Sequence, residues 1–237
     1  MIELYAFRIP DQIDYHSYTD LLQLVSTEKQ RKIERFYKPE DAYRTLFADL
    51  LVRHLLMDKY QVSNEDIKFF NNPYGKPYVH GFPKFSFNIS HAGNWIVCAV
   101  DEIPLGIDIE LIKPIDFTIA KNFFSEEENE DLRKIDASRK LEYFFELWTI
   151  KESYVKALGT GLSVNLNAFT VKKAGKDQIH IIRQDHLSPN LVKQYDIDPL
   201  YKCSLCSINP NFPEKPVLIE YKELEALLCK VDSVMKS

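Results

Sequence analysis

The sequence predicts an α+β fold, because helical and strand periodicities are mixed along the chain without the strict alternation of a doubly wound sheet. Its 237 residues suffice for one large domain or two fused domains of roughly 100–150 residues each. A break in the pattern near residues 102–106 favours two halves, 1–103 and 104–237. Each half then contains strands and a long helix.

In the first half, alternating apolar residues predict strands at residues 1–8, 85–89 and 95–101. Ser26 is expected to cap a basic helix, and a second helix is expected to begin near Pro39. That second helix carries apolar residues at helical spacing, namely Leu46, Leu50, Leu51 and Leu55. Between the helices and the later strands, the sequence YGKP predicts a tight turn.

The second half has strand patterns at residues 106–110, 168–172, 178–183 and 201–208. Ser125 and Glu128 form an S-x-x-E capping box, and a long helix is expected from about Ser138 to Gly159. The tail carries Leu227, Leu228 and Val231, which predict a terminal helix packed on the body of the protein.

Composition excludes several classes of protein. The N-terminus lacks a basic patch followed by a long apolar run, and no apolar stretch approaches the roughly 18–20 residues that cross a bilayer, so we expect a cytoplasmic protein without membrane association. A net charge of −5 argues against general affinity for nucleic acid. Cys203 and Cys206 lie three apart on a predicted strand, which sends them to opposite faces and favours a structural role.

Two carboxylates stand out in the sequence LGIDIE. Asp108 and Glu110 lie two apart on a predicted strand and therefore share one face. They are either the solvated face of a half-buried strand or a site for a divalent cation, since Mg²⁺ prefers carboxylate oxygens.

A second pair lies on the long helix. Glu152 and Lys156 are four residues apart and project from one face. In one interpretation they form a surface ion pair. In the other, Glu152 binds a metal or activates a hydroxyl, and Lys156 neutralises a phosphate.

Further candidates are polar residues near predicted turns. Ser90 and His91 lie at the end of a predicted strand, and they do not form a catalytic pair because consecutive side chains on a strand diverge. Two interpretations of these residues remain: contact with a phosphate, or an ordinary surface position. Lys29 and Lys32 on the basic helix, with Arg44 on the next, form either a phosphate cradle or a solvated charged face.

The segments YGKP, FNISH, GIDIE, FFSEEE and LWTIKESYVKALGTGLS occur in the order seen in the Sfp-type 4′-phosphopantetheinyl transferases, which this chain resembles from Ser26 to about Glu225. The likeness is greatest to the members that activate surfactin and gramicidin synthetases. It implies a monomer of two similar α+β halves, related by a pseudo-two-fold axis, with the active site in the cleft between them.

The resemblance also implies site roles. Asp108, Glu110 and Glu152 correspond to Mg²⁺ ligands, and Lys156 to a lysine that contacts phosphate; Glu152 is compatible with both a ligand and a base. The coenzyme A contacts implied are Lys29, Lys32, Arg44 and His91 around the 3′-phosphate, and Tyr74, Gly75, Lys76, Pro77 and Ser90 at the adenine and diphosphate.

The implied reaction moves phosphopantetheine from coenzyme A to a serine of an apo peptidyl or acyl carrier protein and leaves adenosine 3′,5′-bisphosphate, in nonribosomal peptide, polyketide or fatty acid synthesis. Two alternatives remain: a binding module without catalysis, and a Mg²⁺-dependent phosphohydrolase. Residues 112–124, with Lys113 and Lys121, are expected to be mostly core but to leave an exposed residue for an acidic carrier.

Overall fold

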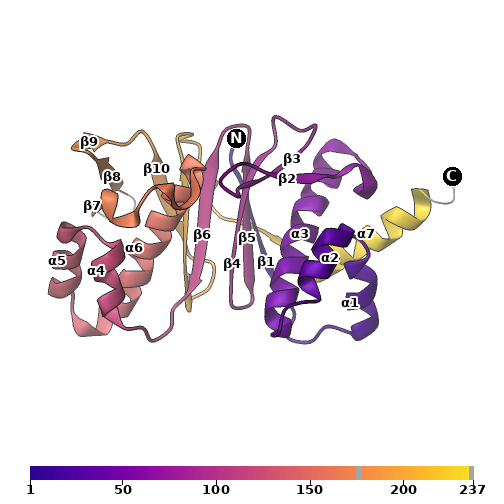
Figure 1. The fold of residues 1–237 in the computed structure, drawn as a ribbon, viewed down its shortest axis with the longest axis horizontal. Coiled ribbons are helices and arrows are strands. Elements are labelled where there is room, and N and C mark those ends of the chain that lie inside the picture. The colour runs from indigo at the N-terminus through magenta and orange to yellow at the C-terminus, as the bar shows by residue number, and fades with distance from the viewer. Residues whose placement is uncertain (175–177, 235–237) are drawn as a thin grey trace.

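Two β-sheets lie side by side in the middle of the molecule, and helices cover the outer side of each (Figure 1). This computed structural model describes residues 1–174 and 178–234. On one side lie α1 (Tyr15–Leu22), α2 (Thr27–Ile33), α3 (Pro39–Tyr60) and α7 (Tyr221–Val234). On the other lie α4 (Ala120–Phe123), α5 (Glu126–Lys134) and α6 (Ala137–Leu158). The mixture of helices and strands confirms the α+β class.

The first sheet has the strand order β12-β1-β5-β4. It contains β1 (Glu3–Arg8), β4 (Ser86–Ala92), β5 (Trp95–Asp101) and β12 (Val217–Ile219). Strands β1 and β4 are antiparallel to β5, whereas β12 is parallel to β1. The second sheet has the order β10-β11-β6 and is antiparallel; it contains β6 (Leu105–Leu111), β10 (Leu191–Tyr195) and β11 (Tyr201–Ser207).

Smaller elements lie outside these sheets. Strands β2 (Phe69–Asn71) and β3 (Pro77–Val79) form a hairpin, and β7 (Thr170–Lys173), β8 (Ile179–Arg183) and β9 (His186–Leu187) form a small antiparallel sheet. Short 3₁₀ helices span Asn64–Asp66, Phe117–Ile119, Gly161–Ser163 and Leu166–Ala168.

Three apolar cores follow from this layering. One lies between the first sheet and α3, one between the second sheet and α6, and one joins the two sheets. Strand β11 contributes to two of them: Cys203 packs in the core between the sheets and Cys206 in the core beneath α6. Both are free thiols, and their packing in different cores confirms the prediction that they face opposite sides of the strand.

The helix ends follow local signals in the sequence. The Ser26 side chain accepts a hydrogen bond from the Lys29 backbone, and both bonds of the capping box form between Ser125 and Glu128. Gly159 ends α6 at φ +68°, a conformation that costs glycine little. These predictions are confirmed, whereas α1, α4, β2, β3, β9, β10 and β12 were not identified from the sequence.

The final segment returns to the first half of the chain. Strand β12 pairs with β1, and α7 places Leu224 and Leu227 in the core that α3 covers. Leu228 packs partly buried against the same core, which confirms the predicted terminal helix, while Val231 lies outside the described side chains. Strands β1, β4 and β5 of the first sheet thus precede every strand of the second sheet in the chain, and β12 returns to complete the first.

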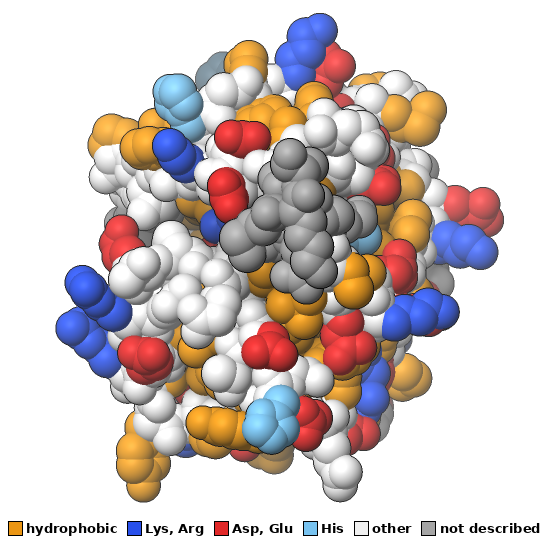
Figure 2. All heavy atoms as spheres, turned by 90° about the vertical axis from the view of Figure 1, so that its right-hand side faces the viewer, with side chains coloured by type: hydrophobic (Ala, Val, Ile, Leu, Met, Phe, Trp, Pro, Cys, Tyr) orange, Lys and Arg blue, Asp and Glu red, His pale blue; other side chains and the backbone are white. Residues whose placement is uncertain are grey.

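On the face seen in Figure 2, which looks onto the side where α7 lies in Figure 1, Lys and Arg side chains alternate with Asp and Glu. They do not gather there into a basic surface. Among the helices of residues 1–174 and 178–234, none is both long and apolar enough to cross a membrane.

Candidate active site

Side chains bridge the two sheets where β4 and β6 approach each other. The Asn88 Oδ1 accepts a 2.7 Å hydrogen bond from the Ile107 backbone, and the Ser90 hydroxyl donates to Asp108 Oδ1 at 2.9 Å. Asn88, Ser90 and Asp108 are all buried. The motifs FNISH and GIDIE, one from each half, therefore meet at a single junction.

Helix α6 adds Lys156 to this junction. Its Nζ donates to Asp108 Oδ1 at 2.6 Å, to Ser90 Oγ at 3.1 Å and to the Ile107 carbonyl at 3.2 Å. The approach depends on Gly106, because a Cβ there would lie 2.1 Å from the Ser153 carbonyl oxygen. Glycine thus lets the helix backbone pack directly on β6 and bring its lysine to the carboxylate.

The negative charge of Asp108 acts on the carboxyl groups of Glu110 and Glu152. Burial, and then the Asp108 charge, raise the pKa of Glu110 to about 7. The same two causes raise the pKa of Glu152, and Lys156 only partly opposes them. Asp108 Oδ2 is buried without a hydrogen-bond partner. Three carboxyl groups, one with an unsatisfied buried oxygen, would all be stabilised by an added cation.

As the side chains stand, no cluster of three or more His, Cys, Asp or Glu residues within 1–174 and 178–234 is arranged to hold a metal ion. Magnesium does not require such a cage, since it commonly takes one or two carboxylates and completes its shell with water and substrate phosphates. The residues present fit that mode of binding through the free oxygen of Asp108 and its two acidic neighbours.

Cationic groups lie on the side of the junction that faces α3. Arg44 donates to the Gly93 carbonyl at 2.9 Å and to Asp41 at 2.6 Å. Burial lowers the pKa of His91, and the nearby charges of Arg44 and Lys156 lower it further. Arg44 and Lys156 therefore each disfavour the protonated form of His91, and an anion such as a phosphate would offset that effect.

A cavity of about 480 Å³ opens between α2, α3, the β2–β3 hairpin and β4. Lys29, Lys32 and Pro77 line it, and Lys29 pairs with the buried Asp49 at 3.3 Å. The cavity also contacts Ile89 on β4. Because His91 follows Ile89 by two residues, the strand presents both side chains to the same side. The cavity therefore lies on the face of β4 to which His91 also belongs.

The YGKP segment forms the turn of the β2–β3 hairpin. Gly75 takes φ +87°, and Asn72 Oδ1 holds the turn by accepting from the backbones of Tyr74 and Lys76. Tyr74 is 57% exposed at the tip. Lys76 instead points inward, and burial lowers its pKa to about 8. A contact between Lys76 and a nucleotide would therefore come from its backbone.

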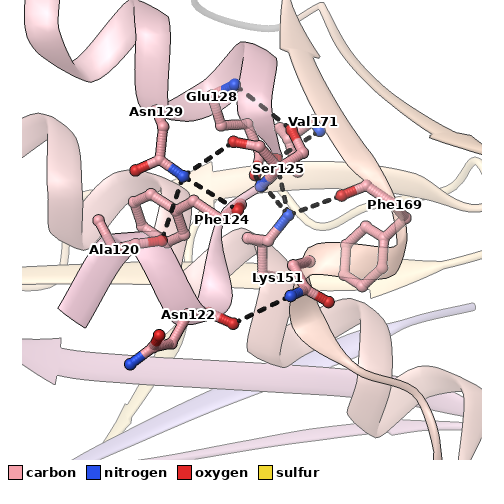
Figure 3. Close-up of polar contacts among 10 residues, drawn as sticks. Ala120, Asn122, Phe124, Ser125, Glu128, Asn129, Lys151, Phe169 and Val171 are labelled. Atoms are coloured by element: carbon pink, nitrogen blue, oxygen red, sulfur yellow. Dashed lines mark hydrogen bonds and ion pairs between the residues drawn. The ribbon is translucent and has the colours of Figure 1, made fainter. Parts of the chain in front are cut away.

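A buried ion pair that the sequence did not reveal holds α6 in place (Figure 3). Lys151 Nζ lies 2.7 Å from both carboxylate oxygens of Glu128 and 2.8 Å from the Phe169 carbonyl oxygen. Glu128 also accepts from the backbones of Ser125 and Val171. The capping box indicated Glu128 but not its partner, because no local spacing links residues 128 and 151.

Two family models match consecutive parts of the chain. The family model described as the N-terminal part of 4′-phosphopantetheinyl transferase matches residues 12–103, and that of the 4′-phosphopantetheinyl transferase superfamily matches residues 104–206. The transferase Sfp of Bacillus subtilis (strain 168) is 41% identical over 223 residues, which cover 94% of this chain and 100% of the relative.

Two further relatives carry the same description. The 4′-phosphopantetheinyl transferase psf-1 of Bacillus pumilus is 38% identical, with 98% of this chain and 100% of the relative covered. The 4′-phosphopantetheinyl transferase gsp of Aneurinibacillus migulanus is 41% identical, with 88% of this chain and 86% of the relative covered.

Proposed function

The chain belongs to the 4′-phosphopantetheinyl transferase superfamily, and from this premise we propose that it transfers phosphopantetheine from coenzyme A to a serine of an apo carrier protein. The enzyme class follows from the relatives, whereas the donor, the metal and the acceptor belong to the proposal. Adenosine 3′,5′-bisphosphate would be the second product. Carrier domains of nonribosomal peptide, polyketide or fatty acid synthesis would be the acceptors.

The contact of Lys156 with Asp108 and Ser90 supports this proposal most directly. It joins a cation, an acidic cluster and a phosphate-binding candidate from both halves of one chain. Transfer of a phosphoryl-type group needs mainly neutralised charge and an aligned nucleophile; such a junction supplies the charged groups, and the carrier would supply the nucleophile. Because one chain contributes every group, we propose that the monomer is active.

Asp108, Glu110 and Glu152 would hold Mg²⁺, which supplies Lewis-acid stabilisation of charge on the diphosphate when it is bound. Lys156 neutralises further negative charge on the phosphates. Glu152, directly or through a water, accepts the proton of the carrier serine. The serine oxygen then bonds to the phosphorus that carries the pantetheine arm, and the bond from that phosphorus to the bridging oxygen of the diphosphate breaks. The bridging oxygen leaves with adenosine 3′,5′-bisphosphate.

For the nucleotide, we propose the cavity lined by Lys29 and Lys32, with Arg44 and His91 beside it and the turn of Tyr74, Gly75 and Pro77 against the adenine. Lys29→Ala with Lys32→Ala should raise KM for coenzyme A more than KM for 3′-dephospho-coenzyme A, since the lost charges are assigned to the 3′-phosphate. Equal increases for both substrates would move these lysines away from that phosphate.

The central experiment incubates the protein with coenzyme A, Mg²⁺ and several apo carrier proteins, followed by intact mass measurement. Transfer adds one phosphopantetheine to the carrier, and Asp108→Ala should abolish it while Glu130→Gln, an exposed carboxylate on α5, serves as the matched control. Adenosine 3′,5′-bisphosphate released without any carrier would favour a phosphohydrolase instead. Wild-type turnover by Asp108→Ala would remove the metal assignment.

A further inference from the structure

The turn from Asn72 to Lys76 is docked on the C-terminal end of α6. Asn72 Nδ2 donates to the Gly159 carbonyl at 3.0 Å, while its Oδ1 holds the turn together. A Cβ at Gly159 would lie 3.5 Å from Lys76 Cδ, and one at Gly161 would lie 3.0 Å from the Tyr74 carbonyl oxygen. The turn and the end of the helix are therefore in close contact across the two halves.

Lys76 makes the strongest link in this contact. Its Nζ donates to the Lys156 carbonyl and to the Leu105 carbonyl, both at 2.8 Å. Residue 156 lies in the last turn of α6, where backbone carbonyls have no partner within the helix. An ammonium group there satisfies a free carbonyl and also stabilises the negative end of the helix dipole.

The two carbonyls belong to elements that carry the reacting groups. One is the backbone oxygen of Lys156, whose side chain contacts Asp108 and Ser90. The other belongs to Leu105, the first residue of the strand that carries Asp108 and Glu110. A single side chain from the hairpin thus connects the helix and the strand of the candidate active site.

We propose that Lys76 is a positioning residue, which fixes the nucleotide-binding turn, the end of α6 and the start of β6 relative to one another. Its ammonium acts through the two carbonyls and does not bind a phosphate. This role rests on the proposed function for its effect on turnover. The link itself is independent of that function, because it consists of contacts within the chain.

The test separates binding from chemistry. Lys76→Met keeps the length of the side chain and removes its donors, so kcat at saturating coenzyme A should fall at least about tenfold, since small misplacements of reacting groups have large costs. The Kd for 3′,5′-ADP, measured by calorimetry without Mg²⁺ or carrier, should change by less than about threefold, because Asn72 Oδ1 still holds the turn through the backbones of residues 74 and 76. Lys76→Arg, which can still donate to both carbonyls, should restore most of kcat.

A second variant covers the case in which Lys76→Met does not fold. Asn72→Asp keeps the oxygen that holds the turn and removes the donor to Gly159, so it should show the same pattern in a weaker form. In both variants, amide hydrogen exchange should become faster at the end of α6 and in the turn, and remain as in the wild type in β7 and β8.

The outcomes are distinct. A tenfold rise in the Kd for 3′,5′-ADP with kcat unchanged would make Lys76 a phosphate ligand and overturn the proposal, and so would unchanged kinetics and exchange in both variants. If the wild-type protein transfers no phosphopantetheine, the proposed function fails. Hydrogen exchange then still decides whether Lys76 connects the turn to α6.

Discussion

Addition of Mg²⁺ should release protons from this protein, and the amount should follow the titration of Glu110. Burial and the Asp108 charge raise the pKa of this carboxyl to about 7, so it retains its proton at pH values where an ordinary glutamate is ionised. A metal ligand must be deprotonated, so binding of the cation expels that proton. The metal-free protein should correspondingly lose stability as pH rises from the unfolded pKa of about 4.5 through 7, and Mg²⁺ should restore it.

The amount follows from the pKa. A group with a pKa of about 7 is roughly nine-tenths protonated at pH 6, half protonated at pH 7 and one-tenth protonated at pH 8. Saturation with Mg²⁺ should therefore release about 0.9, 0.5 and 0.1 protons from Glu110 at these three pH values. Glu152 adds protons in the same direction, because its pKa is also raised.

The release can be measured with a pH-indicator dye in weakly buffered solution, with Ca²⁺-free MgCl₂ as titrant and NaCl of equal ionic strength as control. Glu110→Gln should lower the release at pH 6 by nearly one proton, and Glu130→Gln should leave it unchanged. Release that is absent at pH 6 and 7, or equal in the wild type and Glu110→Gln, would refute the role of Glu110 as a ligand.

Three further predictions concern residues outside the reacting group. Lys151→Met leaves Glu128 buried without its cation and should destabilise the protein by about 3–5 kcal/mol in denaturant unfolding, whereas Lys151→Met with Glu128→Gln, which removes the buried charge but keeps a side-chain oxygen as acceptor for a backbone N–H, should recover part of this loss. If the single and double variants are equally unstable, the loss comes from packing rather than from the unpaired charge. Gly106→Ala should lower the melting temperature and transfer together, because its Cβ would lie 2.3 Å from the Ala157 backbone nitrogen; unchanged values of both would contradict the close packing of α6 on β6. Lys113→Glu with Lys121→Glu should raise KM for the carrier at low salt and leave KM for coenzyme A nearly unchanged; a carrier KM that does not respond would mean docking elsewhere.

The prediction for Lys113 and Lys121 depends on how residues 112–124 pack. Within residues 112–124, Phe124 is buried and Ile112, Ile115, Phe117 and Phe123 pack partly buried against the core. Ile119 is 38% exposed, and both lysines lie on the surface. The expectation of a mostly apolar core segment with an exposed residue is therefore confirmed, while the docking of a carrier there stays a prediction.

The sequence by itself determined the features whose causes are local. Ser26, the Ser125–Glu128 box and Gly159 mark helix ends through contacts within a few residues, so their positions were predicted correctly. Strand alternation likewise separated Cys203 from Cys206. It also indicated that Asp108 and Glu110 share a face, and the Asp108 charge contributes, after burial, to the raised pKa of Glu110.

Only the tertiary structure decided which of these local patterns meet. Spacing on the helix suggested that Lys156 pairs with Glu152, but packing on Gly106 brings its ammonium to Asp108 and Ser90 instead. The resemblance assigned Lys76 to the adenine and diphosphate of coenzyme A, yet its ammonium donates to the backbone carbonyls of Lys156 and Leu105. Such contacts join residues 48 to 80 positions apart, and their partners are fixed by how sheets and helices pack rather than by backbone propensity or side-chain period.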